Sequence, residues 1–301
     1  MISSLAEIEK LARSAEPVAT AVIAPEDHEF ILAVKEAHRD NFIRPVLIGR
    51  RTAIEEAADR AEYDLETTPI IEIADRQEIA NQAIEMLASG KVGMVSKGQI
   101  STNYIYRAII AKMKARKEEA VISVQTFWDI RGCDHLVLIT DPGANISPDD
   151  REKKAILNNA LQIMPLLGYT CPEVLELISD SAILKDRQNP SSSIKTPVIS
   201  DNRGSFTLLE PRVLKNVLRG DDAHSVNLNH LPHILLVPDL NTGNIVAKLD
   251  FFIKDIVRVS CSYTSMGPIL LPSRADIAES IMREIIFGVA LVTLRRRLAD
   301  D

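Results

Sequence analysis

Ser273 and Arg274 are the residues with the most evident chemistry, because they stand between a short apolar run and a helical pattern. An arginine guanidinium offers planar paired donors that suit a phosphate, and a serine hydroxyl can donate to an oxygen on which negative charge develops. Capping is the alternative, since Ser273 with Asp276, or Asp276 with Glu279, has the spacing of a capping box. The pattern is consistent with either an anion-binding site or the beginning of a helix.

A second candidate lies in the segment that begins with Lys97 and Gly98. The glycine permits a tight turn after a strand, and Ser101 or Thr102 then begins a helix that carries Arg107. A helix N-terminus with two hydroxyl groups and a nearby lysine can hold a phosphate or a carboxylate. The alternative is that a hydroxyl only caps the helix and that Arg107 is a solvated helix residue.

Two further strand ends carry polar turns. Asp239 follows the apolar run 234–237 and precedes a glycine-bearing turn with Asn244. This turn could hold an anion, or its polar side chains could only satisfy the backbone. The other turn starts at Asp141, and Ser147 with the proline after it has the signature of a helix N-cap.

The elements that must position these residues follow from the apolar pattern. Short apolar runs alternate with helix-length segments at 26–39 and 77–88, which predicts buried parallel strands in an α/β fold. Such folds bind ligands beyond the carboxyl ends of their strands. The predicted strands are 18–23, 45–48, 69–73, 92–95, 120–126, 135–140, 196–199, 234–237, 257–262 and 268–271.

Composition excludes several classes of protein. The 301 residues are 46% apolar and 26% charged, which is typical of a globular protein, and the net charge of −7 argues against a broad nucleic-acid-binding face. Three widely spaced cysteines form neither a disulfide framework nor a CxxC metal site, and they fit a reducing cytoplasm. The apolar stretch 285–294 is about half the length of a membrane span and predicts a buried or interface helix.

Taken in order, the strand-end segments resemble the phosphate acetyltransferase/phosphate butyryltransferase family, and the butyryltransferase branch more closely. The resemblance covers nearly the whole chain. It is carried by 94–98 with Ser101, Thr102 and Arg107, by 138–141 with Asn145, by 237–244, and by 268–276, together with the early strand 46–49.

The resemblance implies a two-domain α/β protein with mostly parallel sheets flanked by helices and a ligand cleft between the domains. Isocitrate and isopropylmalate dehydrogenases share this architecture, but Asp239, Asp276 and Glu279 are too few acidic residues for their metal and nicotinamide chemistry. Domain I would comprise 1–142 and 266–301, and an inserted domain II would comprise 143–265. A homodimer in the cytoplasm is expected, with no nucleic-acid or membrane partner.

The resemblance also implies a reaction, the transfer of a short-chain acyl group (butyryl, branched or acetyl) between coenzyme A and phosphate. Coenzyme A would be a substrate, and no permanent cofactor, metal or acyl-enzyme is expected. Ser273 would stabilise the charge on the carbonyl oxygen, and Arg274 and Arg107 would hold phosphate groups of acyl phosphate or coenzyme A. The remaining predicted phosphate- and coenzyme-A-binding residues are Lys97, Ser101, Thr102, Asn145, Asp239 and Asn244.

The sequence departs from the family pattern at three places, of which Ser280 fits the butyryltransferase branch and the other two favour an alternative function. Ser280 stands where the acetyltransferases carry an aspartate assigned as base, so the general base is unassigned. Val124 stands where butyryltransferases often carry a histidine, and the loop 201–205 is changed. The alternative is therefore a catalytically altered or inactive relative that binds coenzyme A, acyl phosphate or another anion as a sensor or partner.

Overall fold

The computed structural model describes residues 1–178, 198–201, 204–209, 218, 227–273 and 275–300. The chain forms two compact units. The larger unit comprises Leu5–Ile122 and Val259–Asp301, and the smaller unit comprises Met1–Ser4 and Ser123–Arg258. The division into domains at residues 142 and 266 stays a prediction. Most of the turn-rich segment 179–225 lies outside the described residues.

The sheet of the larger unit is mostly parallel, as the continuous apolar runs predicted. Every neighbouring pair is parallel except the pair of β11 and β12, which is antiparallel. The strands, in sheet order, are β3 (Ile70–Glu72), β2 (Ile43–Gly49), β1 (Val18–Ile23), β4 (Met94–Lys97), β12 (Pro268–Leu270) and β11 (Ile256–Tyr263).

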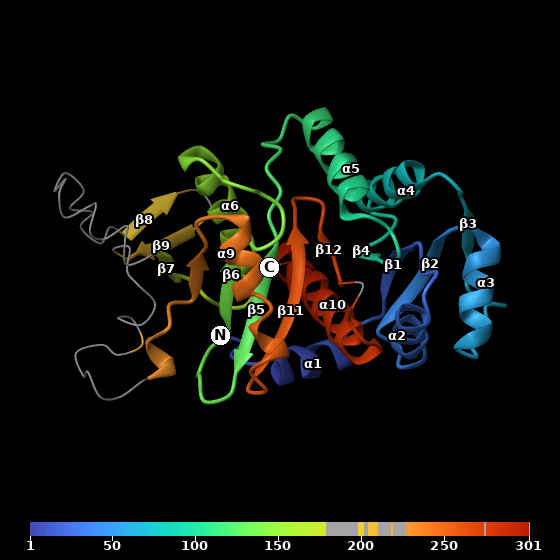
Figure 1. The fold of residues 1–301 in the computed structure, drawn as a ribbon, viewed down its shortest axis with the longest axis horizontal. Coiled ribbons are helices and arrows are strands. Elements are labelled where there is room, and N and C mark those ends of the chain that lie inside the picture. Colours follow the sequence, from blue (N-terminus) through green and yellow to red (C-terminus); the bar gives the residue numbers. More distant parts are fainter. Residues whose placement is uncertain (179–197, 202–203, 210–217, 219–226, 274, 301) are drawn as a thin grey trace. The chain divides into compact units, whose positions relative to one another are not determined.

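Helices pack against this sheet in two groups (Figure 1). The first group is α1 (Leu5–Arg13), α2 (His28–Arg39), α3 (Arg51–Arg60) and α10 (Ala278–Asp300). The second group is α4 (Arg76–Ala88) and α5 (Thr102–Ala115), which share one apolar core with the ends of β1 and β4. Because helices cover it, strand β1 has almost no polar residue, and its side chains Val18, Val22 and Ile23 are fully buried.

Helix α10 contains the apolar stretch 285–294, and Ile285, Phe287 and Leu291 are fully buried, as the sequence predicted. Gly288 lets this helix approach the sheet closely, since a Cβ there would lie 2.7 Å from the sulfur of Met94. In the described part of the chain, none of the helices combines the length and the apolar character that crossing a membrane requires.

The smaller unit also has a mostly parallel sheet. Strands β6, β10, β7 and β9 run parallel, while β5 and β8 are antiparallel to their neighbours at the two ends of the series. In sheet order the strands are β5 (Gln125–Ile130), β6 (Val137–Thr140), β10 (Ile234–Leu236), β7 (Glu173–Glu176), β9 (Gly204–Leu208) and β8 (Val198–Asp201). Its helices are α6 (Asp150–Ile163) and α9 (Leu240–Val246), and its 3-10 turns are η1 (Leu228–His230) and η2 (Leu249–Phe251).

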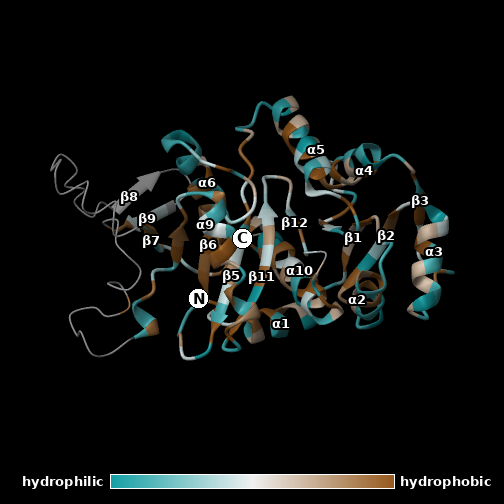
Figure 2. Cartoon of the chain, in the orientation of Figure 1, coloured by the Kyte–Doolittle hydropathy of each residue, from teal (hydrophilic) through white to brown (hydrophobic). Residues whose placement is uncertain are grey.

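Both units have the polarity of layered α/β folds (Figure 2). Strands such as β6 are coloured mostly brown, and the outward turns of α4 are mostly teal. All four residues of β6 are buried. The smaller unit buries Val137, Ile139 and Leu235 in one apolar cluster. The chain is thus an α/β protein in which helices flank mostly parallel strands.

Two predicted boundaries differ most from the structure, and two strands were not predicted. The strand predicted at 120–126 begins only at Gln125 and runs to Ile130, because its register against β6 starts with the pair Gln125 and Thr140. The N-cap of α6 is Asp149 rather than Ser147, since Asp149 forms a capping box with Glu152. Strands β7 and β9 are the two that were not predicted.

Candidate functional site

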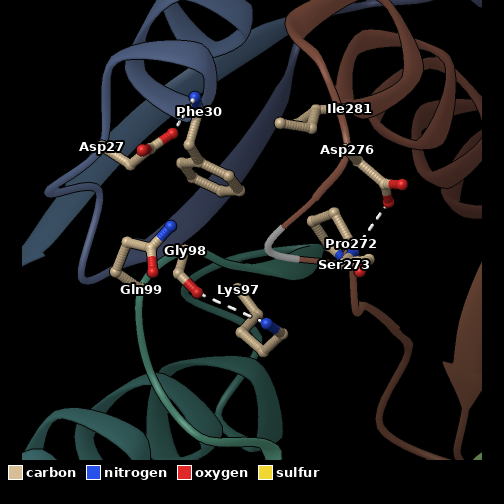
Figure 3. A pocket seen from close by; sticks show the side chains of 9 residues that line it. All are labelled: Asp27, Phe30, Lys97, Gly98, Gln99, Pro272, Ser273, Asp276 and Ile281. Atoms are coloured by element: carbon tan, nitrogen blue, oxygen red, sulfur yellow. Dashed lines mark hydrogen bonds between the residues drawn. The ribbon is translucent and has the colours of Figure 1, made fainter.

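A pocket opens in the larger unit at the carboxyl ends of β4 and β12, two strands that are parallel neighbours (Figure 3). Its interior measures about 10 Å³, or about 230 Å³ when the open solvent at its mouth is counted. The pocket brings together Lys97 and Ser273, which the sequence singled out separately. Its lining residues are Asp27, Phe30, Lys97, Gly98, Gln99, Pro272, Ser273, Asp276 and Ile281.

Lys97 reaches the pocket through a turn that only glycine allows. The N–H of Gly98 donates to the carbonyl of Ile23 at 2.8 Å, and the N–H of Gln99 donates to the carbonyl of Ala24 at 2.8 Å. A Cβ on Gly98 would lie 2.3 Å from that same Ala24 oxygen. The loops after β1 and β4 therefore touch, and the buried Lys97 ammonium donates to the Gly98 carbonyl at 3.4 Å.

Helix α5 begins directly after this turn. Ser101 is its N-cap residue, but the Ser101 side chain makes no capping hydrogen bond. The sequence left open that the Ser101 hydroxyl only caps the helix, and the structure shows no such bond. Thr102 is the first helical residue, and Arg107 is exposed, with its guanidinium 6.0 Å from the centre of the Tyr104 ring.

Ser273 lies in a closed turn that Asp276 holds. The Ser273 N–H donates to the buried Asp276 carboxylate at 2.7 Å, and the Asp276 N–H donates back to the Ser273 carbonyl at 3.1 Å. The Ser273 side chain is exposed beside the pocket. Arg274 lies outside the described residues.

This turn does not start helix α10, so the capping alternative is wrong for Ser273. The helix begins at Ala278, whose N–H donates to the carboxylate of Glu29 on α2 at 2.8 Å. Glu279 does not complete a capping box, since its carboxylate pairs with Arg283 at 3.1 Å. The turn that displays Ser273 is thus a separate feature, built ahead of the helix.

The larger unit also holds a carboxylate with little exposure, Glu26, directly before the pocket residue Asp27 in the chain. Glu26 lies at the end of β1 and pairs with Arg76 at 2.8 Å and with Arg50 at 3.1 Å. Burial by itself would raise the pKa of Glu26, but the hydrogen bonds and charges of the two arginines outweigh it and hold the pKa below its ordinary value. The next residue, Asp27, caps α2 by accepting the N–H of Phe30 at 3.2 Å.

In the smaller unit, Asp141 organises the turn after β6. Its buried carboxylate accepts the N–H groups of Val124 at 2.8 Å, Gly143 at 3.1 Å and Asn145 at 2.8 Å. The Asn145 side-chain amide donates to the same carboxylate at 2.6 Å. Burial raises the pKa of Asp141, and these hydrogen bonds partly offset the rise. Asn145 therefore helps to hold this turn together.

The turn after β10 lies against the turn after β6. A Cβ on Gly243 would lie 2.8 Å from the Cα of Pro142, so the two backbones are in close contact. Asp239 caps α9 by accepting the Thr242 N–H at 2.8 Å, which is the turn role that the sequence left open. The Asn244 amide lies 3.5 Å from the Pro142 carbonyl.

The structure thus places the predicted residues in two groups, each within its own unit. Lys97 and Ser273 share the pocket, and α5 with Arg107 begins beside it. Asn145, Asp239 and Asn244 lie on the two touching turns of the smaller unit. Asp276 and Asp141 belong to the predicted motifs but were not predicted as site residues. The carboxylate of each accepts backbone N–H groups and so stabilises a loop. The signal for each was an aspartate in a turn after a buried strand.

Comparisons with known proteins agree with the resemblance. The chain is 27% identical over 285 residues to a phosphate butyryltransferase of Clostridium beijerinckii, which covers 92% of this chain and 93% of the relative. It is 28% identical over 278 residues to a phosphate acetyltransferase of Rickettsia felis, which covers 87% of this chain and 77% of the relative. No family model matches the chain.

Solved structures show the same fold. A branched-chain phosphotransacylase from Enterococcus faecalis V583 superposes with a TM-score of 0.69 at 19% identity, covering 91% of this chain and 99% of the other. A phosphotransacetylase from Streptococcus pyogenes gives a TM-score of 0.65 at 13% identity and covers 96% of this chain and 99% of the other. The resemblance to phosphate butyryl- and acetyltransferases is confirmed.

Proposed function

We propose that this chain is a phosphate acyltransferase that moves a short-chain acyl group between coenzyme A and inorganic phosphate. The observation that carries the proposal is the pocket in which Lys97 and Ser273 meet at the ends of neighbouring parallel strands. An ammonium group and an exposed hydroxyl suit a phosphate group that is bonded to a carbonyl carbon, as in an acyl phosphate. The similarity to named phosphate acyltransferases over most of the chain supports the same conclusion.

In the proposed reaction, the sulfur of coenzyme A attacks the carbonyl carbon of an acyl phosphate. A carbon–sulfur bond forms, the carbon–oxygen bond to phosphate breaks, and inorganic phosphate departs, while the thiol proton passes to the departing phosphate or to solvent. The Ser273 hydroxyl donates to the carbonyl oxygen as it gains negative charge. Lys97 stabilises the leaving phosphate, because an ammonium group attracts a negative charge more strongly in a buried site than in water.

The other predicted residues have roles in binding. Ser101, Thr102 and Arg107 present donors at the beginning of α5, where the helix dipole favours a negative charge. Arg274 adds a guanidinium next to Ser273. Asn145, Asp239 and Asn244 remain predicted contacts for coenzyme A or phosphate, and their bonds within the two turns set the shape of that surface.

The finer features of the proposal follow the family resemblance. The substrates bind in a cleft between two domains, coenzyme A is a substrate rather than a resident cofactor, and the enzyme works as a homodimer in the cytoplasm. The acidic net charge of −7 supports the expectation of no nucleic-acid partner.

Release of the coenzyme A thiol from acetyl-, propionyl-, butyryl- and isobutyryl-CoA, measured with and without phosphate, tests the proposal. We expect phosphate-dependent release with at least one ester, and the best ester identifies the acyl group.

Ser273→Ala should lower turnover about 100-fold, as for other donors to an oxyanion. Ser89→Ala, at an exposed helix end of the same unit, is the matched control and should retain full turnover. Absence of phosphate-dependent release with every ester would reject the activity.

A second candidate function is binding without turnover. The observation in its favour is Val124, whose buried apolar side chain packs against Gly143 and brings no proton-carrying group to that position. This candidate predicts a saturable rise in melting temperature with coenzyme A and no thiol release. Rapid turnover of any ester would exclude it.

A further inference from the structure

Three potential metal ligands meet in the turn between β5 and β6. Cys133, Asp134 and His135 are consecutive, and their ligand atoms all lie within 4.8 Å of one another. The Cys133 sulfur lies 3.7 Å from His135 Nδ1, and an Asp134 carboxylate oxygen lies 2.8 Å from the same nitrogen. Within the part of the chain that the structure describes, no other group of His, Cys, Asp and Glu gathers three such atoms.

The protein holds these side chains in place through a second segment, η1 and the residue after it. The Asp134 N–H donates to the Asn229 side-chain oxygen at 3.0 Å, and the Cys133 thiol donates to the Leu228 carbonyl at 3.6 Å. The buried His135 ring is fixed by its Nε2, which lies 2.8 Å from the Leu231 carbonyl. Histidine ligands of metals commonly donate their other ring nitrogen to a carbonyl in this way.

One spacing matches an edge of a metal coordination shell, but the Cys133 sulfur lies 3.7 Å from His135 Nδ1 and 3.9 Å from Nε2, so it must shift toward the in-plane side of Nδ1 to share a cation with that nitrogen. Tetrahedral zinc, with Zn–S of about 2.3 Å and Zn–N of about 2.0 Å, separates sulfur and nitrogen by about 3.6 Å. The observed distance from Cys133 Sγ to His135 Nδ1 is 3.7 Å, and the distance from Cys133 Sγ to the Leu228 carbonyl is 3.6 Å. The 2.8 Å distance from His135 Nδ1 to Asp134 must also lengthen, and the Asp134 side chain is exposed.

We propose that Cys133, Asp134 and His135 bind a divalent cation of the zinc class. A thiolate and an imidazole favour Zn²⁺ and exclude Mg²⁺ and Ca²⁺, which prefer oxygen ligands. On binding, the thiol proton of Cys133 and the proton shared by His135 and Asp134 pass to solvent, and the cation replaces them. The Leu228 carbonyl or a water molecule supplies the fourth ligand.

The site has a structural role and does not rest on the proposed function. The turn precedes β6, whereas Asp141 follows β6 at its other end, so the metal would not touch the turn that Asp141 organises. Its effect would be to join the β5–β6 turn to the η1 turn. The sequence predicted no metal site, because the three cysteines are widely spaced without a CxxC pair and because the family resemblance implies no metal.

Titration of the whole chain with Co²⁺, followed by competition with Zn²⁺, tests the proposal. We expect one cation per chain and a near-ultraviolet band from thiolate bound to cobalt. Cys133→Ser should abolish that band and weaken Zn²⁺ binding at least about 100-fold, since a lost ligand costs no less than a lost supporting contact. Cys171→Ser is the matched control, because Cys171 is an exposed free cysteine of the same unit.

Three results would overturn the proposal. They are no uptake of Zn²⁺ or Co²⁺ by the native chain, a cobalt–thiolate band that survives in Cys133→Ser, and equal loss of the band in Cys171→Ser. Asp134→Asn provides a second variant at an exposed position, and it should weaken Zn²⁺ binding while leaving the circular dichroism spectrum unchanged. Hydrogen exchange at 228–231 should slow when Zn²⁺ binds, which a surface-bound ion would not cause.

Discussion

The pocket beside Lys97 and Ser273 and the paired turns 141–145 and 239–244 are both built at the carboxyl ends of parallel strands, but they use their polar groups differently. In the pocket, the turns are held mainly by backbone bonds and by Asp276, and the exposed Ser273 hydroxyl makes one long bond in its own turn, accepting the Ala275 N–H at 3.4 Å. In the paired turns, Asn145 and Asp239 bond to groups of their own turns. A polar turn after a strand therefore indicates a site only when other groups hold the turn in place.

The largest effect is expected at Asp141. Asp141→Ala removes a buried carboxylate and leaves the N–H groups of Val124, Gly143 and Asn145 without an acceptor, so the free energy of unfolding should fall by about 4 kcal/mol. Asp149→Ala, which removes an exposed helix cap, should cost about 1 kcal/mol. Urea unfolding measures both. Equal costs would show that the Asp141 turn is no more tightly built than an ordinary cap.

Gly98→Ala should cost about 3 kcal/mol, because its Cβ would meet the Ala24 carbonyl, a backbone atom that cannot turn away. Gly90→Ala is the matched control, since that Cβ meets no atom within 4 Å. Only its positive φ opposes the substitution, at about 1 kcal/mol. Urea unfolding gives the difference. If Gly98→Ala proves the milder change, the contact between the β1 and β4 loops is not rigid.

Asp276 should act on turnover through Ser273. Asp276→Ala removes the acceptor of the Ser273 N–H and should lower kcat about tenfold, with a loss of about 1.5 kcal/mol in stability. Asp276→Asn retains an oxygen that can accept the same bond and should restore most of kcat. Steady-state kinetics with the best acyl-CoA separates the two variants. If Asp276 has a purely structural role, Asp276→Ala should lose stability but keep the kcat of the native chain, and Asp276→Asn should recover the stability.

The smallest effect is expected at Glu26, and it depends on pH. Since Arg50 and Arg76 hold the folded-state pKa of Glu26 below its ordinary value of 4.5, ionised Glu26 stabilises the fold above pH 4.5. This stabilisation is lost as the pH falls through the lowered folded-state pKa. Between pH 6 and 3 the native chain should lose about 1 kcal/mol more stability than Glu26→Gln.

Chemical unfolding at several pH values measures this difference. Glu55→Gln is the control, because the Glu55 carboxylate is exposed in its pair with Arg51. It should retain the pH dependence of the native chain. If the free energy of unfolding of Glu26→Gln changes with pH as it does in the native chain, Arg50 and Arg76 do not lower the pKa of Glu26.

Much of the fold could be predicted from local patterns. Strand 18–23 was predicted at its observed bounds, and the burial of 285–294 followed from its apolar run. A continuous apolar run predicts a buried strand, because a strand that helices cover on both faces has no side chain in contact with solvent. The same patterns placed Lys97 and Ser273 at strand ends.

The partners of the polar groups could not be predicted in this way. The cap of α10 comes from Glu29, which is 249 residues away in the chain. Asp276 fits a capping box by spacing, yet it holds a turn that precedes the helix. Spacing along the chain gives every such side chain several possible partners, and the packing of distant segments selects among them.

The sequence by itself determined the alternation of buried strands and helices and the positions of the reactive residues at strand ends. Only the tertiary structure decided that Lys97 and Ser273 share a pocket, through the parallel pairing of β4 with β12. It also decided that Asn145 and Asp239 support their own turns. The physical reason is that burial is a property of one segment, whereas a hydrogen bond or a pocket needs two segments brought together by the fold.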